Sequence, residues 1–509
     1  MAFSLRAIML RAFFSGQSLY DLLVIGGGIN GAGIARDAQG RGLKTLLVEA
    51  RDLASATSSA SSKLIHGGLR YLEQYEFRLV REALIEREVL LKLAPHLVRP
   101  LSFVLPHRPH LRPAWMIRTG LFLYDHLGGR ERLPGSYGID CRTHPFGKPL
   151  ASDIRSAFVY SDCWVDDARL VVLNARDAAD RGGDVRTRTR CVEARRENGA
   201  WRVRLADEAG ATTEVGARAL VNAAGPWVNE VLGQVVHANS PKHLRLIKGS
   251  HIVVPRIHDG NQAYILQNED RRIVFVLPYE GRFSLIGTTD EPFDGDPASV
   301  AIAPAETTYL CDVVTRHFRT RVAPEDVVWT YAGVRPLHDD ANVKASQVTR
   351  DYAFDVDTTG GVPMLSVFGG KITTFRKLAE HALDKLAPHL PGMGRAWTGS
   401  APLPGGGMPS ADFEAFLADL QRRRPWLANP HRLARAYGTE IERLIGDAGA
   451  AADLGRDFGL GFTERELDYL VTREWARMPD DALWRRSKLG LHLPADAKAG
   501  IADWFTRRS

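Results

Sequence analysis

The chain has 509 residues, of which 45% are hydrophobic and 25% charged, so it can bury a large core and is predicted to hold two or three domains. Its net charge of +6 is modest, and 66 basic residues balanced by 60 acidic ones disfavour a nucleic-acid-binding protein. Four widely spaced cysteines form no metal-binding pattern and indicate a reducing, cytosolic compartment. No apolar run approaches the roughly 20 residues of a membrane span, so any membrane contact is expected to be peripheral.

Residues 1–20 form an extension before the first predicted strand. Arg6 and Arg11 are its only charged side chains, and apolar residues crowd around them. An interfacial helix, a targeting segment and an extension without a role all fit this pattern. We expect a poorly ordered tail.

A dinucleotide-binding unit is predicted to start at residue 21. The apolar residues 21–25 form a strand, a glycine-rich turn follows, and a helix then continues to about residue 40. Gly26 permits the sharp turn, Gly28 lets a pyrophosphate approach the backbone, and Gly31 lets the helix pack closely on the strand. The N–H groups and partial positive charge of the helix N-terminus favour phosphate binding there.

A second apolar strand, residues 45–48, ends on Glu49. A carboxylate at this position can accept hydrogen bonds from a ribose diol and would repel a 2′-phosphate, which disfavours NADP. A lone glycine-rich turn is weak evidence, but the strand, turn, helix and acid together strongly predict a dinucleotide site.

Small hydroxyl residues dominate the next segment, 55–62, which passes into Leu64, Ile65 and the pair Gly67 and Gly68. A flexible linker would continue in Gly and Ser instead. Small residues with many N–H and O–H donors suit a loop that lies along a pyrophosphate and against a flat ring.

The middle of the chain alternates between predicted helices and strands. Residues 75–93 are predicted to be helical, and three prolines keep 105–113 extended. We expect the apolar helix 115–127 in the core, with a membrane-contact patch as the alternative. A strand then leads to Asp166 or Asp167 as a helix cap.

Two later segments are predicted to return to the dinucleotide. A buried strand closes on Ala223, Ala224 and Gly225, and residues 365–376 repeat the order of strand, glycine pair and helix. The first domain is therefore discontinuous in sequence. The N-terminus of the last helix can stabilise negative charge on a bound redox ring.

Residues 245–331 read as short strands separated by Gly and Pro, which predicts a mostly antiparallel sheet over the cofactor. A linker at 401–409 is followed by a helical segment in which we find no catalytic constellation.

The glycine turn of residues 26–33, the segment 58–71 and the later segments quoted above closely resemble the FAD-dependent glycerol-3-phosphate dehydrogenases. The resemblance covers nearly the whole chain from Asp21 onward. It implies oxidation of sn-glycerol 3-phosphate to dihydroxyacetone phosphate, with electrons passed through FAD to a membrane quinone. It also implies peripheral attachment to the cytoplasmic face of the inner membrane and a homo-oligomer, a dimer.

The fold class is accordingly predicted as α/β, with a Rossmann-like FAD-binding domain, an antiparallel substrate sheet and a C-terminal all-α cap. The predicted boundaries are 1–20 for the extension, 21–100, 156–240 and 331–390 for the FAD-binding domain, 101–155 and 241–330 for the substrate domain, 391–410 for the linker and 411–509 for the helical cap. The expected FAD contacts are Gly26, Gly28, Ile29, Asn30, Gly31, Glu49, Ala50, Ser58, Ser59, Ser62, Lys63, Leu64, His66, Gly67, Gly68, Ala223, Ala224, Gly225, Gly333, Arg335, Gly370, Lys371, Ile372 and Thr373.

Oxidation of a secondary alcohol requires a hydride acceptor and a base for the hydroxyl proton. Histidine suits the second task because its pKa lies near 6.5. Among 16 histidines, His251 and His66 lie in family-like segments near glycines, and we expect His251 as the first choice for the base and His66 as the second.

A phosphate ester requires cations, and Arg335 and Lys371 both follow glycine turns that return to the cofactor. Arg70 and Tyr71 could complete the pocket. We expect Arg335 and Lys371 in both substrate binding and catalysis, and the sequence does not separate their roles.

Three alternatives remain open from the sequence. The nearest is a glycerol-3-phosphate oxidase, which would pass electrons to oxygen and release hydrogen peroxide. An amine-oxidising flavoenzyme is disfavoured by the Arg335 and Lys371 pair. A non-catalytic dinucleotide-binding module is disfavoured by the cationic pocket.

Overall fold

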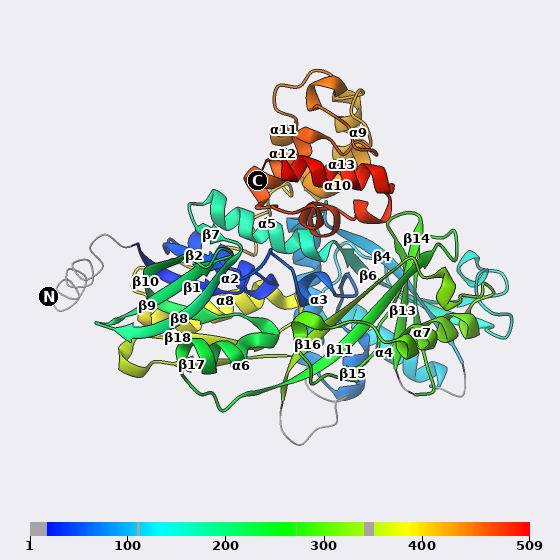
Figure 1. Cartoon of the computed structure of the whole chain (residues 1–509). Coiled ribbons are helices and arrows are strands. Elements are labelled where there is room, and N and C mark those ends of the chain that lie inside the picture. Colours follow the sequence, from blue (N-terminus) through cyan, green and yellow to red (C-terminus); the bar gives the residue numbers. More distant parts are fainter. Residues whose placement is uncertain (1–17, 109–111, 271, 340–350, 509) are drawn as a thin grey trace.

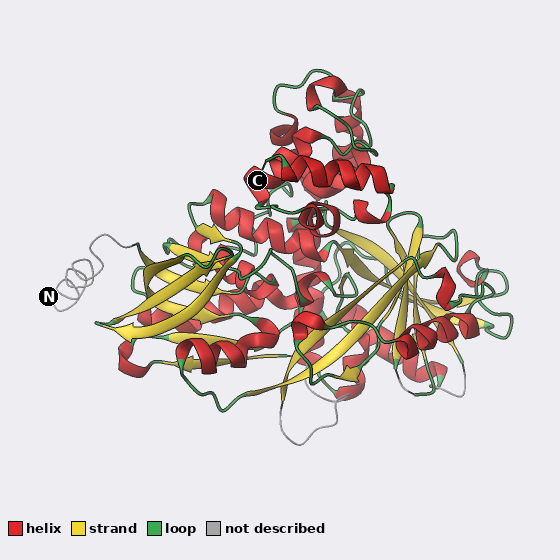
Figure 2. Cartoon of the chain, viewed as in Figure 1, coloured by secondary structure: helices red, strands yellow, loops and turns green. Residues whose placement is uncertain are grey.

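The computed structural model describes residues 18–108, 112–270, 272–339 and 351–508, so almost all of the N-terminal extension lies outside the described residues. In the described part, two sheets lie side by side, and the C-terminal helices sit above their junction (Figure 1). Figure 2 shows the same view. The part that holds β1, which we call the FAD-binding lobe, has its helices stacked against its strands.

The first strand, β1 (Leu19–Ile25), lies at the centre of the first sheet and pairs in parallel with β2 and β10. Its side chains alternate between two cores. Leu22 and Val24 pack with the helices α2, α5 and α8, whereas Leu23 and Ile25 pack with β8, β9 and the segment after β10. Burial on both faces explains the unbroken apolar run in the sequence.

This sheet has eight strands in the order β17-β18-β10-β1-β2-β7, with β9 paired to β10 and β8 paired to β9. The other strands are β2 (Thr45–Val48), β7 (Asp184–Arg186), β8 (Thr189–Glu197), β9 (Ala200–Asp207), β10 (Thr212–Asn222), β17 (Tyr352–Asp357) and β18 (Met364–Gly369). The helices of the lobe are α2 (Ile29–Gly40), α5 (Asp167–Asp180), the short α6 (Val228–Glu230) and α8 (Phe375–Leu386). Asp166 caps α5, as predicted, by accepting a hydrogen bond of 3.2 Å from Arg169 N.

The second sheet has ten strands, ordered β15-β11-β14-β13-β12-β4-β6-β3, with β16 on β11 and β5 on β6. They are β3 (Leu64–Ile65), β4 (Val98–His107), β5 (Tyr137–Asp140), β6 (Ser156–Val165), β11 (His243–Pro255), β12 (Ala263–Gln267), β13 (Ile273–Tyr279), β14 (Phe283–Gly287), β15 (Glu291–Pro292) and β16 (Trp329–Asp339). The pairing of β12 with β4 is parallel and the other pairings are antiparallel, so the sheet is mixed and, as predicted, mostly antiparallel. The helix α7 (Pro304–His317) packs on it.

Strand pairing also moves two of the predicted domain boundaries. The strand β6 pairs with β4 along its whole length, so the chain returns to the FAD-binding lobe at Asp166 and not at residue 156. The strand β16 pairs with β11 up to Asp339, so residues 331–339 belong to the second sheet. The periodicity of a buried strand does not reveal which sheet it joins.

Residues 409–508 form a helical unit with its own hydrophobic core. Its helices are α9 (Phe413–Arg423), α10 (Pro430–Tyr437), α11 (Ile441–Ile445), α12 (Glu464–Glu474) and α13 (Ala495–Thr506). A six-residue turn, η14 (Asp481–Arg486), faces the two sheets.

Two further helices, α3 (Phe77–Leu93) and α4 (Ala114–Leu127), pack against one another near the second sheet. The expectation that α4 is a core helix is wrong for one face. Ile117 and Leu121 are buried, whereas Trp115 and Phe122 are 68% and 60% exposed. None of the described helices is long and apolar enough to cross a bilayer.

Candidate active site

A long cavity runs between the two sheets and divides into two parts. The first part, of about 400 Å³, lies at the carboxyl ends of β1 and β2, and the second, of about 270 Å³, lies under the second sheet. Ile29, Thr57, Ser58, Pro336 and Gly370 line both parts, so the two are continuous. The carboxyl ends of parallel strands are the usual ligand site of such a sheet.

The glycine turn after β1 is too crowded for side chains. Gly26 has a φ of +111°, and a Cβ there would lie 2.5 Å from Ala223 O. A Cβ on Gly31 would overlap Gly26 O. These contacts press α2 against β1 and leave its N-terminus open to the cavity, where Gly28, Ile29 and Asn30 line the wall. The arrangement matches an anion site at a helix N-terminus.

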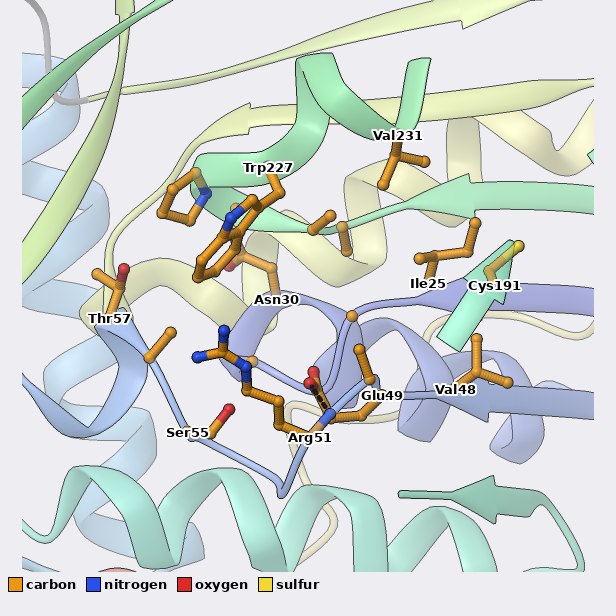
Figure 3. Close-up of a pocket in the computed structure, with 18 of the residues that line it drawn as sticks. Ile25, Asn30, Val48, Glu49, Arg51, Ser55, Thr57, Cys191, Trp227 and Val231 are labelled. Carbon is orange, nitrogen blue, oxygen red and sulfur yellow. Dashed lines mark hydrogen bonds between the residues drawn. The ribbon is translucent and has the colours of Figure 1, made fainter. Parts of the chain in front are cut away.

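Glu49 lies at the end of β2 and points into the first part of the cavity (Figure 3). Its carboxylate accepts hydrogen bonds from Gly27 N at 2.6 Å and Arg51 N at 2.8 Å. Burial raises the pKa of the Glu49 carboxyl. Two backbone donors fix the carboxylate where a ribose diol can reach it.

The side chains across this part of the cavity were not predicted. Trp227 and Val231, from the segment after β10, and Cys191 on β8 line the same part of the cavity as Glu49 (Figure 3). Trp227 lies two residues after the predicted Gly225, and this proximity in the sequence is the signal that could have identified it. Cys191 comes from an antiparallel strand whose position depends on the tertiary fold.

Asn30 lines the first part of the cavity, next to Ile29, which lines both parts. Its Nδ2 donates to Gly369 O at 3.2 Å, while its Oδ1 is buried and accepts no hydrogen bond from the described residues. Ile29 N donates to Ser58 Oγ at 3.0 Å, which ties the hydroxyl loop to the helix N-terminus. A buried oxygen without a hydrogen-bond donor, next to the N-terminus of α2, indicates that a ligand supplies the donor there.

His251 lies on β11 within the second part of the cavity and is 3% exposed. Its Nε2 lies 2.9 Å from Ser62 Oγ, and its ring stacks on Tyr331 at 4.7 Å and 15°. Burial, and then the positive charges of Lys63 and Arg335, hold the pKa of His251 well below its usual value. The imidazole is therefore neutral at pH 7 and able to accept a proton.

His66 lines the same part of the cavity as His251. Its backbone N donates to Thr373 Oγ1 at 3.2 Å, and its ring meets Phe275 edge-on at 6.4 Å. The structure thus brings together both predicted histidines, from segments 185 residues apart in number.

The predicted cations also line this part, together with Arg70 and Tyr71. Lys371 Nζ lies over the Tyr71 ring, 3.7 Å from its centroid. Arg335 Nη2 donates to Thr289 O at 2.9 Å and Thr288 Oγ1 at 3.1 Å, and Nη1 forms an ion pair with Asp290. The turn of residues 288–290 lies within the predicted strand region 245–331, and no site residue was predicted in that turn.

Four of the expected FAD contacts line neither part of the cavity: Gly31, Ser59, Lys63 and Gly67. Lys63 is 1% exposed, and its ammonium pairs with Asp167 at 2.9 Å. Gly67 N donates to Tyr124 Oη at 2.8 Å. Lys63 and Gly67 therefore hold the loop in place from behind.

Comparison with known proteins agrees with this geometry. The family model described as FAD dependent oxidoreductase matches residues 21–376. Aerobic glycerol-3-phosphate dehydrogenase of Escherichia coli is 58% identical over 95% of this chain and 97% of its own length. The chain belongs to the FAD-dependent glycerol-3-phosphate dehydrogenase family.

Other members of this family, and their neighbours, cover the chain as fully. D-erythritol 1-phosphate dehydrogenase of Brucella abortus is 53% identical over 95% of this chain and 97% of its own length. The glycerol-3-phosphate dehydrogenase of Bacillus halodurans, solved with FAD, has 26% identity and a TM-score of 0.75, covering 96% of this chain and 94% of that one.

Membership confirms the predicted family, its enzyme class and its FAD cofactor. The residues present fit the dinucleotide. The open helix N-terminus can face the pyrophosphate, Glu49 can face the ribose, and the buried Asn30 Oδ1 has no other donor among the described residues.

Proposed function

We propose that this enzyme oxidises sn-glycerol 3-phosphate to dihydroxyacetone phosphate at the second part of the cavity. One observation supports this most directly. A buried, neutral His251 shares the cavity with the cations Arg335 and Lys371, so a base and a phosphate site are within one pocket. A phosphomonoester alcohol requires this combination.

Each side chain has a defined task in this mechanism. Arg335 and Lys371, with Arg70 in the same part of the cavity, receive the phosphate and orient the secondary hydroxyl toward His251. His251 Nε2 accepts the hydroxyl proton. In the structure this nitrogen is within hydrogen-bonding distance of Ser62 Oγ, at 2.9 Å. FAD, when bound, supplies the acceptor for the hydride. A positioned general base contributes roughly 10²- to 10⁴-fold to the rate.

The relative from Brucella abortus gives a second candidate substrate. That protein is named for D-erythritol 1-phosphate, and its 53% identity to this chain is close to the 58% of the Escherichia coli enzyme. Both substrates carry a phosphate and a secondary alcohol, so both would use the same base and cations. The tetritol adds one hydroxylated carbon, which must fit within the cavity of about 270 Å³.

We propose a membrane quinone as the electron acceptor and peripheral attachment to the membrane. The exposed aromatic face of α4 supports this attachment. Trp115, Met116 and Phe122 are exposed on α4. Beside it, Tyr75 is exposed directly after η2 (Leu69–Gln74), and Phe77 is exposed at the start of α3. Clustered exposed aromatic residues on an amphipathic helix are typical of interfacial binding. The family resemblance further supports a dimer and attachment to the cytoplasmic face of the inner membrane.

An anaerobic titration of the purified yellow protein tests the reaction. Glycerol 3-phosphate and D-erythritol 1-phosphate are added to separate samples while flavin absorbance is followed. We expect glycerol 3-phosphate to bleach the flavin more efficiently than the tetritol phosphate, with a higher ratio of limiting reduction rate to dissociation constant. Preferential bleaching by the tetritol phosphate would reassign the substrate, and no bleaching by either would reject the reaction.

Reoxidation then separates the acceptors. A quinone analogue and oxygen are admitted to separate portions of the reduced enzyme. Fast reoxidation by the quinone and slow reoxidation by oxygen are expected of the dehydrogenase. Fast reoxidation by oxygen with release of peroxide would identify the oxidase instead.

A further inference from the structure

A continuous series of ring contacts, two stacked and one tilted, connects His251 to the C-terminal helical unit. His251 stacks on Tyr331 at 4.7 Å, Tyr331 meets Trp329 at 5.2 Å and 44°, and Trp329 stacks on Trp484 at 4.6 Å and 21°. Trp329 and Tyr331 are two residues apart on β16, so their side chains share one face of the sheet. His251 is the register partner of Tyr331 on β11.

The ring at the far end, Trp484, is firmly anchored. It lies in η14, and its neighbours Arg485 and Arg486 both form ion pairs with Asp52, in the loop after β2. Asp481 in the same turn pairs with Arg188 at 2.9 Å. These contacts fix η14 to the FAD-binding lobe while its tryptophan reaches the second sheet.

The Trp484 ring is also packed closely from its own side. A Cβ on Gly490 would lie 2.5 Å from the indole, so no side chain could separate that backbone from the ring. Between Gly490 on one side and Trp329 on the other, the indole has little freedom to tilt.

The Tyr331 ring is held at its edge and its face. Its Oη donates to Ser61 O at 2.8 Å, in the hydroxyl loop next to Ser62. The Lys63 ammonium lies 5.1 Å from the ring centroid and is itself fixed by Asp167. Burial raises the pKa of Tyr331, so the hydroxyl remains a donor at neutral pH.

His251 itself lacks the usual second anchor of a catalytic histidine. In most such sites a hydrogen bond to the other ring nitrogen sets the ring orientation. Here Nδ1 is buried and has no hydrogen-bond partner among the described residues. Gly287, the register partner on the other side, leaves room for the ring because a Cβ there would overlap it. Packing therefore has to define the ring plane.

We propose that Trp484 is a positioning residue for the reaction, acting through Trp329 and Tyr331 on the plane of the His251 ring. This inference rests on the proposed role of His251 as the base. It gives the C-terminal unit a function in catalysis although none of its residues lines the second part of the cavity. Small displacements of a catalytic group can slow a reaction by about 10²-fold.

Three substitutions test the proposal on the holoenzyme: Trp484→Ala, Trp484→Leu and Trp484→Phe. The measurement is anaerobic stopped-flow reduction of the bound flavin by glycerol 3-phosphate, which separates the limiting rate from substrate affinity. We expect Trp484→Ala and Trp484→Leu to lower the limiting rate by about 10- to 100-fold with affinity changed less than about threefold. Trp484→Phe should recover most of the rate because it keeps a flat ring.

Trp426→Ala is the matched control, since Trp426 packs on the core of the same helical unit and makes no ring contact with the stack. It should lower the melting temperature without slowing flavin reduction. If Trp484→Ala does not fold, the comparison of Leu with Phe decides. Equal limiting rates for wild type, Trp484→Leu and Trp484→Phe would overturn the proposal.

The proposed function can fail independently of this inference. Wild-type flavin that is not bleached by substrate rejects the function. Wild-type flavin that is bleached, with a rate unaffected by His251→Asn, rejects the base. If substrate bleaches the wild-type flavin and His251→Asn slows the reduction, but substitution of Trp484 leaves the rate unchanged, only the positioning role is rejected.

Discussion

The carboxylate of Asp290 pairs with the guanidinium of Arg335, and both residues line the second part of the cavity. One cation of the proposed phosphate site, Arg335, therefore already has a carboxylate partner. Arg335 is held in addition by Thr288 and Thr289, so its position does not depend on the ion pair alone. The carboxylate orients the arginine but also opposes an incoming phosphate.

Removal of the guanidinium should weaken substrate binding. We expect Arg335→Ala to lower the affinity for glycerol 3-phosphate by about 10- to 100-fold, because hydrogen bonds to charged groups contribute roughly 1.5–3 kcal/mol. FAD retention should stay near that of wild type. Flavin titration with substrate provides the affinity, and the absorbance ratio of flavin to protein provides the retention. Arg282→Ala, at an exposed hairpin of the same sheet, is the control. Loss of FAD with unchanged substrate affinity would contradict the role of Arg335.

Neutralising the carboxylate should have the opposite effect on anions. Asp290→Asn is expected to tighten the binding of inorganic phosphate, measured as a competitive inhibitor, by about fivefold, or roughly 1 kcal/mol. Thr288 and Thr289 should keep Arg335 in place. Asp294→Asn, an exposed acid further along the same segment, should leave the inhibition constant unchanged. Weaker phosphate binding would mean that the orientation of Arg335 matters more than the charge of Asp290.

The proposed base can be tested through its pH dependence. Because the pKa of His251 lies well below 6.5, the wild-type rate of flavin reduction should stay level from pH 8 to pH 6.5 and decline only at lower pH. His251→Asn should slow reduction by roughly 10²- to 10⁴-fold and flatten the profile. His66→Asn is the comparison. A larger loss from the His66 substitution would move the base to that residue.

Another buried histidine should make the fold sensitive to acid. His96 is 1% exposed, and burial, with Arg169 and Arg435 nearby, lowers the pKa of His96 to about 3. Below about pH 6.5 the His96 imidazole is protonated in the unfolded chain but stays neutral in the folded chain. The free energy of unfolding is therefore highest above that pH and decreases as the pH falls. The loss between pH 7 and pH 5 should be about 2 kcal/mol.

Denaturant unfolding at the two pH values measures this effect. The His96→Gln variant should lose less stability than wild type on acidification, since its amide does not titrate. The control variant His243→Gln, at an exposed position on β11, should lose as much unfolding free energy between pH 7 and pH 5 as wild type. The same pH dependence in all three proteins would assign the acid sensitivity elsewhere.

The exposed face of α4 should govern membrane binding. The double substitution Trp115→Ser and Phe122→Ser is expected to reduce co-sedimentation with anionic phospholipid vesicles by more than about tenfold, because each aromatic contributes roughly 1.5–3 kcal/mol when buried. Flavin reduction by substrate should be unchanged. Met478→Ser removes a comparably exposed apolar side chain, 54% exposed, from the C-terminal unit and serves as the control. Equal loss in the control would place the membrane contact elsewhere.

The sequence alone determined the dinucleotide unit and the chemistry of the pocket. The turn from β1 into α2, with Gly26, Gly28 and Gly31, is predictable because its geometry depends on neighbouring residues and leaves no room for side chains at Gly26 and Gly31. Glu49 follows from its position at the end of β2. The histidines that line the second part of the cavity were predicted from family-like segments, and Arg335 and Lys371 from the glycine turns that precede them.

Only the tertiary structure decided how distant segments meet. The parallel pairing of β12 with β4, the exposed face of α4 and the pairing of Lys63 with Asp167 all depend on partners that local pattern does not specify. The same holds for the stack from His251 to Trp484, whose two ends are 233 positions apart by number. Residue type and spacing report which chemistry a chain carries. The positions and orientations of the side chains that carry this chemistry are set by contacts between elements that meet only through tertiary packing.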